Sequence, residues 1–267
     1  MRALIFLLSA PLLAETIPDT HEKLIPTLWV QTSVEYAASA QQAYRLARVN
    51  LDLALRDRRW TAALEQQPGY GKLPPAVILD IDETVLDNSP NQAEQVRGRA
   101  SFTPASWDQW VLQARAHAIP GAAEFCQYAA SRKVAVFYLS NRDAKHREAT
   151  AKNLTAAGFP LPDASRLMLR GEKPEWASEK STRRADIARR HRVLLLVGDD
   201  FGDFAAGVRT TVENRRELAA RHATRWGREW IVIPNPGYGS WEGALQEPDR
   251  PQTALEQLWK KESWLRY

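Results

Sequence analysis

Five short apolar runs that alternate with helical stretches constrain the fold of this chain more than any other feature. The runs lie at 76–79, 134–139, 166–169, 193–197 and 230–233. Each has the length of a β-strand, and most are too uniformly apolar for a sheet with one face in water. The stretches between them have a helical pattern at 121–132, 143–157 and 181–191. Strands that alternate with helices predict an α/β fold, in which a parallel sheet carries helices on both faces.

The helix predicted over 143–157 has its own boundary signals. Asp143 is the expected N-cap, and Gly158 is the expected stop. Before the first strand, apolar residues in 22–57 recur at steps of three and four, which indicates one or two amphipathic helices. We therefore expect a single domain over 20–267, with a helical accessory segment at 20–60. Its catalytic core would span 73–245, with a cap-like insertion at 87–118 that roofs the site.

The first residues have the pattern of a secretory signal. Arg2 precedes an apolar run from Ala3 to Ala14, which is too short to span a bilayer and suits a signal peptide over 1–14. The alternative is an N-terminal core helix. Cys126 is the only cysteine, so no intramolecular disulfide and no N-terminal lipid anchor is expected. We predict a secreted, periplasmic protein without a membrane anchor.

The charge balance favours small anions over nucleic acid. The formal net charge is +4 and the pI about 9.2, an excess that is small and scattered along the chain. Arginines gather in 183–192, where the helical pattern favours a solvated face. The five histidines show no metal-ligand spacing, and we expect each at the surface.

Polar residues follow the predicted strands at their carboxyl ends, where parallel sheets bind ligands. The first strand ends on Asp80-Ile-Asp82, whose two carboxylates share one side because side chains alternate in extended chain. The second ends on Ser140-Asn141-Arg142, and the fourth on Gly198-Asp199-Asp200, with Asp203 following. Lys180 stands one helix and one strand before Asp199, so it should reach the same edge. Lys173, which also follows the third strand, is its rival.

So many carboxylates in one place require a cation. Two unit charges about 4 Å apart repel by roughly 4 kcal/mol at an effective dielectric of 20. A cluster of oxygen ligands without His or Cys suits a hard cation, and Mg²⁺ is the expected cofactor. The alternative for Asp80 and Asp82 is N-capping after a strand. We expect Glu83 to be a turn or helix-start residue and Asp200 a helix-start acid.

The same residues suit the cleavage of a phosphate monoester. Asp80 is ionised at neutral pH and can attack phosphorus without a base. The cation and Lys180 would offset its repulsion from the phosphate, and Ser140 with nearby backbone N–H groups would hold the phosphoryl oxygens. Asp82 would protonate the leaving oxygen and later activate water.

The chain resembles the haloacid dehalogenase superfamily, and within it the class C acid phosphatases, also described as the 5′-nucleotidase lipoprotein family. The similar segments span about 27–245 and are WVQTSVEY (29–36), DIDETVLDNSP (80–90), FTPASWDQWV (102–111), IPGAAEF (119–125), SNR (140–142), VGDDFGDF (197–204) and IPNPGYGSWEG (233–243). The resemblance implies a Rossmann-like sheet of order 5-4-1-2-3.

The resemblance also implies roles for single residues. Asp80 becomes the nucleophile and Asp82 the acid/base, with the Asp82 backbone carbonyl as a further Mg²⁺ ligand. Asp199 becomes a metal ligand, and Asp203 orients Lys180 or a metal-bound water. Ser140 and Lys180 become phosphate contacts.

Substrate contacts beyond the phosphate are less well defined by the sequence. We expect Asn141 and Arg142 to contact substrate, and Phe102 and Tyr238 to stack on a base. Asn91 stands where such phosphatases often have an aromatic residue, so a preference for nucleoside monophosphates stays open.

The sequence also allows two other functions, and it allows a homodimer. An alcohol in place of water would make the protein a phosphotransferase. A non-catalytic surface protein that captures haem or another ligand is the third reading, against which the chain has no Cys-x-x-Cys-His motif. The N-terminal helices could form a homodimer.

Overall fold

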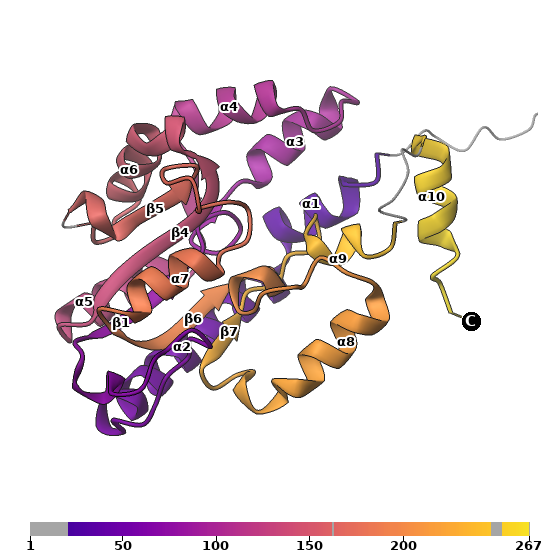
Figure 1. Cartoon of the computed structure of the whole chain (residues 1–267). Helices are drawn as coiled ribbons and strands as arrows, with labels where there is room; N and C mark the ends of the chain where they lie inside the picture. Colours follow the sequence, from indigo (N-terminus) through magenta and orange to yellow (C-terminus); the bar gives the residue numbers. More distant parts are fainter. Residues whose placement is uncertain (1–20, 162, 247–252, 267) are drawn as a thin grey trace, which may run out of the picture.

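A five-stranded parallel sheet organises the chain (Figure 1). The computed structural model describes residues 21–161, 163–246 and 253–266. The strands are β1 (Pro75–Leu79), β4 (Ala135–Asp143), β5 (Leu167–Arg170), β6 (Arg192–Gly198) and β7 (Trp230–Val232). Their order is β5-β4-β1-β6-β7, and every pair is parallel. Counted along the chain, this is the predicted order 5-4-1-2-3 read from the other edge, so the fold prediction is confirmed.

The sheet is buried on both faces because its strands are apolar on both sides. In β1, Val77 and Leu79 pack into the core on one face, while Ala76 and Ile78 pack into the core on the other. All four are at most 4% exposed. This burial explains why the run 76–79 is continuously apolar rather than alternating.

Helices cover both faces of this sheet (Figure 1). On one face, α2 (Val34–Arg56) packs against β6 and β7, and α5 (Ala122–Ser131) packs against β4 and α2. On the other face, α7 (Ser181–Ala188) packs against β6. Ser33 begins α2 as its N-cap, where its side chain accepts a hydrogen bond from the Tyr36 N–H at 3.0 Å. Outside the segment 87–118, the other α-helices of the described residues are α1 (Leu24–Thr32), α6 (Arg147–Ala156), α8 (Val212–Arg221), α9 (Ser240–Gly243) and α10 (Ala254–Glu262).

The segment 87–118 forms a small structure of its own beside the sheet. It contains α3 (Ser89–Arg97) and α4 (Pro104–Gln113), and the short strands β2 (Leu86–Asp87) and β3 (His117–Ala118) pair antiparallel at its ends. α1 contacts α3, and α4 contacts α6. The Trp110 indole N–H donates to Asn88 Oδ1 at 2.7 Å, which ties α4 to the chain just beyond β2.

The helix predicted over 143–157 was placed too early. β4 runs through Asp143 because it pairs with β5 as far as Arg170, and a 3₁₀ turn (Ala144–His146) follows before α6 begins. Asp143 therefore ends a strand, and its carboxylate accepts hydrogen bonds from Arg170. Gly158 does follow the end of α6, in the left-handed conformation at φ +85°.

The predicted signal peptide over 1–14 lies outside the described residues. Among the helices that the structure describes, none combines the length and the apolar character needed to cross a bilayer.

Candidate active site

The predicted site residues meet at the carboxyl ends of β1, β4 and β6. Asp80 directly follows β1, and its backbone N–H donates to the Val197 carbonyl of β6 at 3.0 Å. Ser140 lies near the end of β4, and Asp199 directly follows β6. Lys180 occupies the N-cap position of α7.

Lys180 bridges two carboxylates at this edge. Its Nζ atom hydrogen-bonds to Asp80 Oδ1 and, at 2.6 Å, to Asp203 Oδ1. The Lys180 side chain is 7% exposed, so both ion pairs are screened little by water. Burial alone would lower the pKa of Lys180, but Asp203 and Asp80 outweigh it and raise that pKa.

The two candidate lysines lie in different surroundings. Lys173 lies at the surface, where its Nζ atom is 3.4 Å from Asp186 Oδ2 and 4.3 Å from the centroid of the Trp176 ring. Its amine is thus engaged away from Asp80, whereas the amine of Lys180 contacts Asp80 directly.

Asp80, Asp199 and Asp203 form an all-oxygen cluster. One carboxylate oxygen of each lies within 4.8 Å of the others, close enough to share a cation. Burial raises the pKa of Asp80 to about 7, with Lys180 opposing the shift and Asp203 adding to it. Burial, then Asp80 and Asp203, raise the pKa of Asp199 well above its ordinary value. Three crowded carboxylates with one lysine leave negative charge uncompensated, so this donor set fits a hard divalent cation such as Mg²⁺.

Neutral side chains fix the orientation of Asp199. Its Oδ1 atom accepts a hydrogen bond from the Thr84 hydroxyl at 2.9 Å, and its Oδ2 atom accepts one from the Asn235 amide at 2.8 Å. Thr84 belongs to the turn after β1, and Asn235 follows β7, so two segments far apart in sequence hold this carboxylate in place.

A glycine makes room for Asp203. A Cβ atom added at Gly198 would lie 2.2 Å from Asp203 Oδ2 and 2.4 Å from Asp203 Cβ, which no side chain tolerates. Asp203 Oδ2 accepts the Asp200 backbone N–H at 3.0 Å, and Asp200 Oδ1 accepts the Gly202 N–H at 2.8 Å. Asp200 is thus the N-cap of a 3₁₀ turn (Phe201–Asp203), as expected for a helix-start acid.

The carboxylate of Asp82 has a separate set of partners. The Arg142 guanidinium donates to it from Nε and Nη2, with Nη2 2.7 Å from Oδ1. The Ser140 hydroxyl lies 3.2 Å from Oδ2, and the Asn88 amide donates to Oδ1 at 2.9 Å. Arg142 also donates to the Thr150 hydroxyl at 3.2 Å and is 2% exposed. Arg142, which we expected to contact substrate, therefore contacts Asp82.

Arg183, Arg184 and Arg192 are buried, so the predicted solvated face over 183–192 is wrong for these three arginines. Arg183 and Arg184 are both 0% exposed. Arg183 donates to the Ser140 carbonyl and to Asn141 Oδ1, each at 2.6 Å, so it fixes the loop that carries both residues. Burial lowers the pKa of Arg183 to about 10. Arg184 donates to Glu65 at 2.8 Å and to the Asp203 carbonyl at 3.1 Å.

Glu83 combines the expected turn with a second feature that the sequence did not reveal. Its φ of +58° places it in the left-handed region, and it is 3% exposed. Its carboxylate accepts the Asn88 backbone N–H at 3.1 Å and the Tyr238 hydroxyl. Burial, followed by Asp82, raises its pKa well above the ordinary value. Tyr238 is therefore anchored through its hydroxyl to Glu83, the residue that directly follows Asp82.

The other predicted stacking residue lies farther out. Phe102 is 54% exposed, and its ring centroid is 6.4 Å from that of Trp107. The Trp107 ring in turn lies 5.7 Å from the Arg142 guanidinium carbon. Phe102 thus packs against Trp107, which in turn lies beside Arg142.

His146 was wrongly predicted to lie at the surface. It is 1% exposed, and its Nε2 atom is 2.9 Å from Asp108 Oδ1. Asp108 belongs to α4 and also pairs with Lys145. This contact joins the insertion to the segment that follows Ser140-Asn141-Arg142.

The sequence matches one family over most of its length. The sequence model of the family described as "HAD superfamily, subfamily IIIB (Acid phosphatase)" matches residues 11–241. A curated relative, "Acid phosphatase 1" of Solanum lycopersicum, is 31% identical over 130 residues. The "Stem 31 kDa glycoprotein" of Glycine max is 29% identical over 130 residues. In each case the match covers 47% of this chain, and the chain spans about half the length (50%) of the curated relatives it matches.

Solved structures give a broader match. The class C acid phosphatase from Bacillus anthracis superimposes with a TM-score of 0.81 at 33% identity, over 92% of this chain and 97% of that chain. The same enzyme with tungstate bound gives a TM-score of 0.80 at 32% identity, with the same coverage of both chains.

Proposed function

This chain belongs to the subfamily IIIB acid phosphatases of the HAD superfamily, and we propose that it hydrolyses phosphate monoesters through a covalent intermediate on Asp80. One observation carries the proposal: the Lys180 amine contacts Asp80 and Asp203 at the carboxyl ends of the strands. A buried cation beside a carboxylate that can attack phosphorus is the arrangement that phosphoryl transfer requires, since electrostatic stabilisation dominates that reaction.

In the first step, an Asp80 carboxylate oxygen attacks phosphorus and the bond from phosphorus to the ester oxygen breaks. Lys180 stabilises the charge on the phosphoryl oxygens, and the Ser140 hydroxyl donates to one of them. Asp82, when protonated, gives its proton to the departing oxygen. The Ser140 hydroxyl lies 3.2 Å from Asp82 Oδ2, so the two groups act on neighbouring parts of the substrate.

In the second step, water attacks the same phosphorus and the bond to the Asp80 oxygen breaks. Asp82, now ionised, takes a proton from this water. The donors around Asp82 hold its carboxylate in one orientation for this task. Asp80 is regenerated and inorganic phosphate leaves, so the cycle balances with one water consumed.

Asp80 and Asp199, with the Asp82 backbone carbonyl, would hold a Mg²⁺ ion, and Asp203 orients Lys180 beside it. When bound, the ion supplies positive charge that offsets the repulsion between the phosphate and the carboxylates. The oxygen-only donor set supports this assignment, because carboxylates and carbonyls suit hard cations.

The finer parts of the proposal concern substrate and location. We infer that nucleoside monophosphates are among the substrates, with Tyr238 and the Trp107–Phe102 pair beside the site as ring contacts. The chain would act in the periplasm after removal of its signal peptide. The N-terminal helices carry exposed apolar side chains, including Ile25 and Val34 at 71% and 77% exposure, which supports a homodimer.

The proposal is tested with the purified protein and p-nitrophenyl phosphate. We expect turnover that EDTA abolishes and Mg²⁺ restores. Asp80→Asn should lose at least about 10³-fold in kcat, because it removes the nucleophile without changing side-chain volume. Asp186→Asn, which changes a partly exposed carboxylate on α7 that pairs with Lys173, is the matched control. Equal turnover by Asp80→Asn and the parent protein would refute the mechanism, and added glycerol would reveal any transfer to an alcohol.

A further inference from the structure

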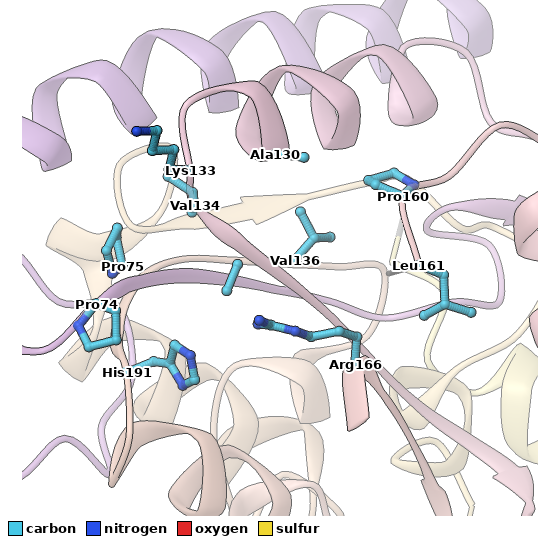
Figure 2. A pocket seen from close by; sticks show the side chains of 11 residues that line it. Pro74, Pro75, Ala130, Lys133, Val134, Val136, Pro160, Leu161, Arg166 and His191 are labelled. Carbon is cyan, nitrogen blue, oxygen red and sulfur yellow. The ribbon is translucent and has the colours of Figure 1, made fainter. Parts of the chain in front are cut away.

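A separate cavity lies at the amino ends of the strands, at the edge of the sheet opposite the candidate active site. Figure 2 shows the side chains that line it. Its volume is about 610 Å³. Small-molecule sites have volumes of roughly 300–1,000 Å³, so the cavity is large enough for a ligand. Its lining comes from the beginnings of β1 and β4, from the end of α5 and from the loops that precede β5 and β6.

The strand register explains why this space exists. β5 pairs with β4 only from Tyr138 onward, so the two preceding lining residues, Ala135 and Val136, have no described strand beside them on that side. Instead, Pro160 and Leu161 of the segment after α6 face the start of β4 across the cavity. The wall on this side is apolar and would suit the hydrocarbon part of a ligand.

Basic side chains occupy the other part of the lining. Arg166 and His191 approach each other there, and Lys133 lies at the rim (Figure 2). The Arg166 guanidinium carbon is 4.5 Å from the Phe137 ring centroid, and the His191 ring centroid is 5.1 Å from it, so one aromatic ring supports both groups. Among the described residues that line the cavity, none is acidic.

Several donors in this basic part lack acceptors. Arg166 Nε and Nη1 and His191 Nδ1 are buried atoms without a hydrogen-bond partner in the part of the chain that the structure describes. The carboxylate that pairs with this arginine belongs to Asp163, whose Oδ2 atom is 3.6 Å from Arg166 Nε, beyond hydrogen-bond distance. A buried donor without a partner costs free energy. A ligand that places an acceptor atom here would remove this cost, which favours its binding.

We propose that this cavity binds a small amphipathic carboxylate, with the carboxylate facing Arg166 and His191 and the hydrocarbon body against Val136 and Leu161. A carboxylate supplies two acceptor oxygens for donors that have none. One negative charge matches this part of the lining better than a phosphate dianion does. Burial, together with Arg166 and Arg190, lowers the pKa of His191, which favours the uncharged imidazole. In the tautomer with its proton on Nδ1, that imidazole donates a hydrogen bond to the carboxylate. The site is separate from the phosphatase chemistry and does not depend on it.

The probe is 1-naphthoate, titrated calorimetrically at neutral pH, with uncharged 1-naphthamide as its partner. We expect saturable binding of one naphthoate per chain, and at least tenfold weaker binding of the amide. Arg166→Gln should weaken naphthoate binding at least tenfold. Arg221→Gln, which changes an exposed arginine on α8 with only a distant ion pair to Glu217 at 3.9 Å, should leave it unchanged.

Two further variants locate the bound probe. Ala130→Trp places a large ring at the cavity wall without altering any charge, so it should abolish binding, with thermal unfolding as the check on folding. Lys180→Met removes the cation of the candidate active site and should leave binding intact. The inference is overturned if naphthoate does not bind, if the amide binds equally well, or if Lys180→Met abolishes binding while Arg166→Gln does not.

Discussion

The Arg142 guanidinium donates three hydrogen bonds to the Asp82 carboxylate, from Nη2 to Oδ1 at 2.7 Å and from Nε to Oδ1 and Oδ2 at 3.0 and 3.2 Å. The Ser140 hydroxyl and the Asn88 amide also donate to this carboxylate, so donors from three side chains surround it. Such a set suits the ionised form, which is the form that accepts a proton from water. Arg142 supplies most of these contacts, so it is the residue that fixes the orientation of the Asp82 carboxylate.

Arg142→Gln should lower kcat by about 10²-fold or more, the usual contribution of a positioned acid or base, with less than about a threefold change in KM. The loss should be larger for an alkyl phosphate than for p-nitrophenyl phosphate, because a poor leaving group depends more on proton donation. Arg170→Gln, which removes a nearby surface pair with Asp143, is the control. A large rise in KM at constant kcat would instead mean that Arg142 binds the substrate.

The fold could be predicted because the apolar runs, and the helical stretches that alternate with them, indicate the same parallel sheet. Uniformly apolar runs specify strands buried on both faces, and Val77 with Ile78 shows this burial directly, since they pack into opposite cores. The position of the site follows from the same pattern, because parallel strands deliver Asp80, Ser140 and Asp199 to one edge. Boundaries were less accurate where tertiary pairing extended an element, as at Asp143.

Side-chain partners could not be predicted when a charged residue was buried. Arg183 and Arg184 were assigned to solvent because the helical pattern of their neighbours favours a solvated face, and arginine is rarely fully buried unless it is paired. A usable signal was present: each is four residues before an apolar residue of α7, Ile187 and Ala188, and therefore shares their buried face. For His146 the burial depends on α4, a helix from a distant part of the chain, so no local pattern indicated it.

Gly198→Ala, at the end of β6, should displace Asp203 and so lower both the stability and the kcat of the protein. The added methyl group would overlap Asp203, which must move and withdraw its oxygen from Lys180. We expect a loss of about 2 kcal/mol in the free energy of unfolding from overpacking and about 10²-fold in kcat from the misplaced lysine. Gly243→Ala is the control, because a Cβ atom there would meet nothing within 4 Å. Denaturant unfolding and steady-state kinetics measure both effects, and normal turnover by the Gly198→Ala variant would show that Asp203 does not position Lys180.

The carboxylate cluster should make the metal-free protein less stable as pH rises. Burial raises the pKa of Asp80 to about 7, so between its unfolded value of 3.8 and 7 the folded state binds more protons than the unfolded state. The free energy of unfolding therefore falls through this window, by about 4 kcal/mol at about 1.36 kcal/mol per pKa unit. In EDTA, Tm should be higher at pH 5.0 than at pH 7.5, and Mg²⁺ should raise Tm mainly at pH 7.5.

Asp199→Asn is the matched variant for this pH effect. It removes one of the mutually repelling carboxylates, so its metal-free form should be more stable than the parent at pH 7.5 and should gain little from Mg²⁺. A parent protein whose Tm rises with pH in EDTA, or a variant that Mg²⁺ stabilises as strongly as the parent, would contradict the assignment of the cluster as a cation site.

Tyr238 can be tested as an anchor and as a stacking residue with two substitutions. Tyr238→Phe keeps the ring and removes the hydroxyl that donates to buried Glu83, so the free energy of unfolding should fall by about 1–3 kcal/mol. If the ring contacts a base, Tyr238→Phe should leave the KM for adenosine monophosphate unchanged. Tyr238→Ala should raise this KM about tenfold, because base stacking contributes roughly 1–3 kcal/mol. The KM of Tyr238→Ala for a small sugar phosphate should not change. Tyr128→Phe, which removes a hydroxyl that donates to Asp52 of α2, is a control for stability alone. An equal rise in KM for both substrates in Tyr238→Ala would mean that Tyr238 does not contact a base. Its role would then be to hold Glu83 in position through its hydroxyl.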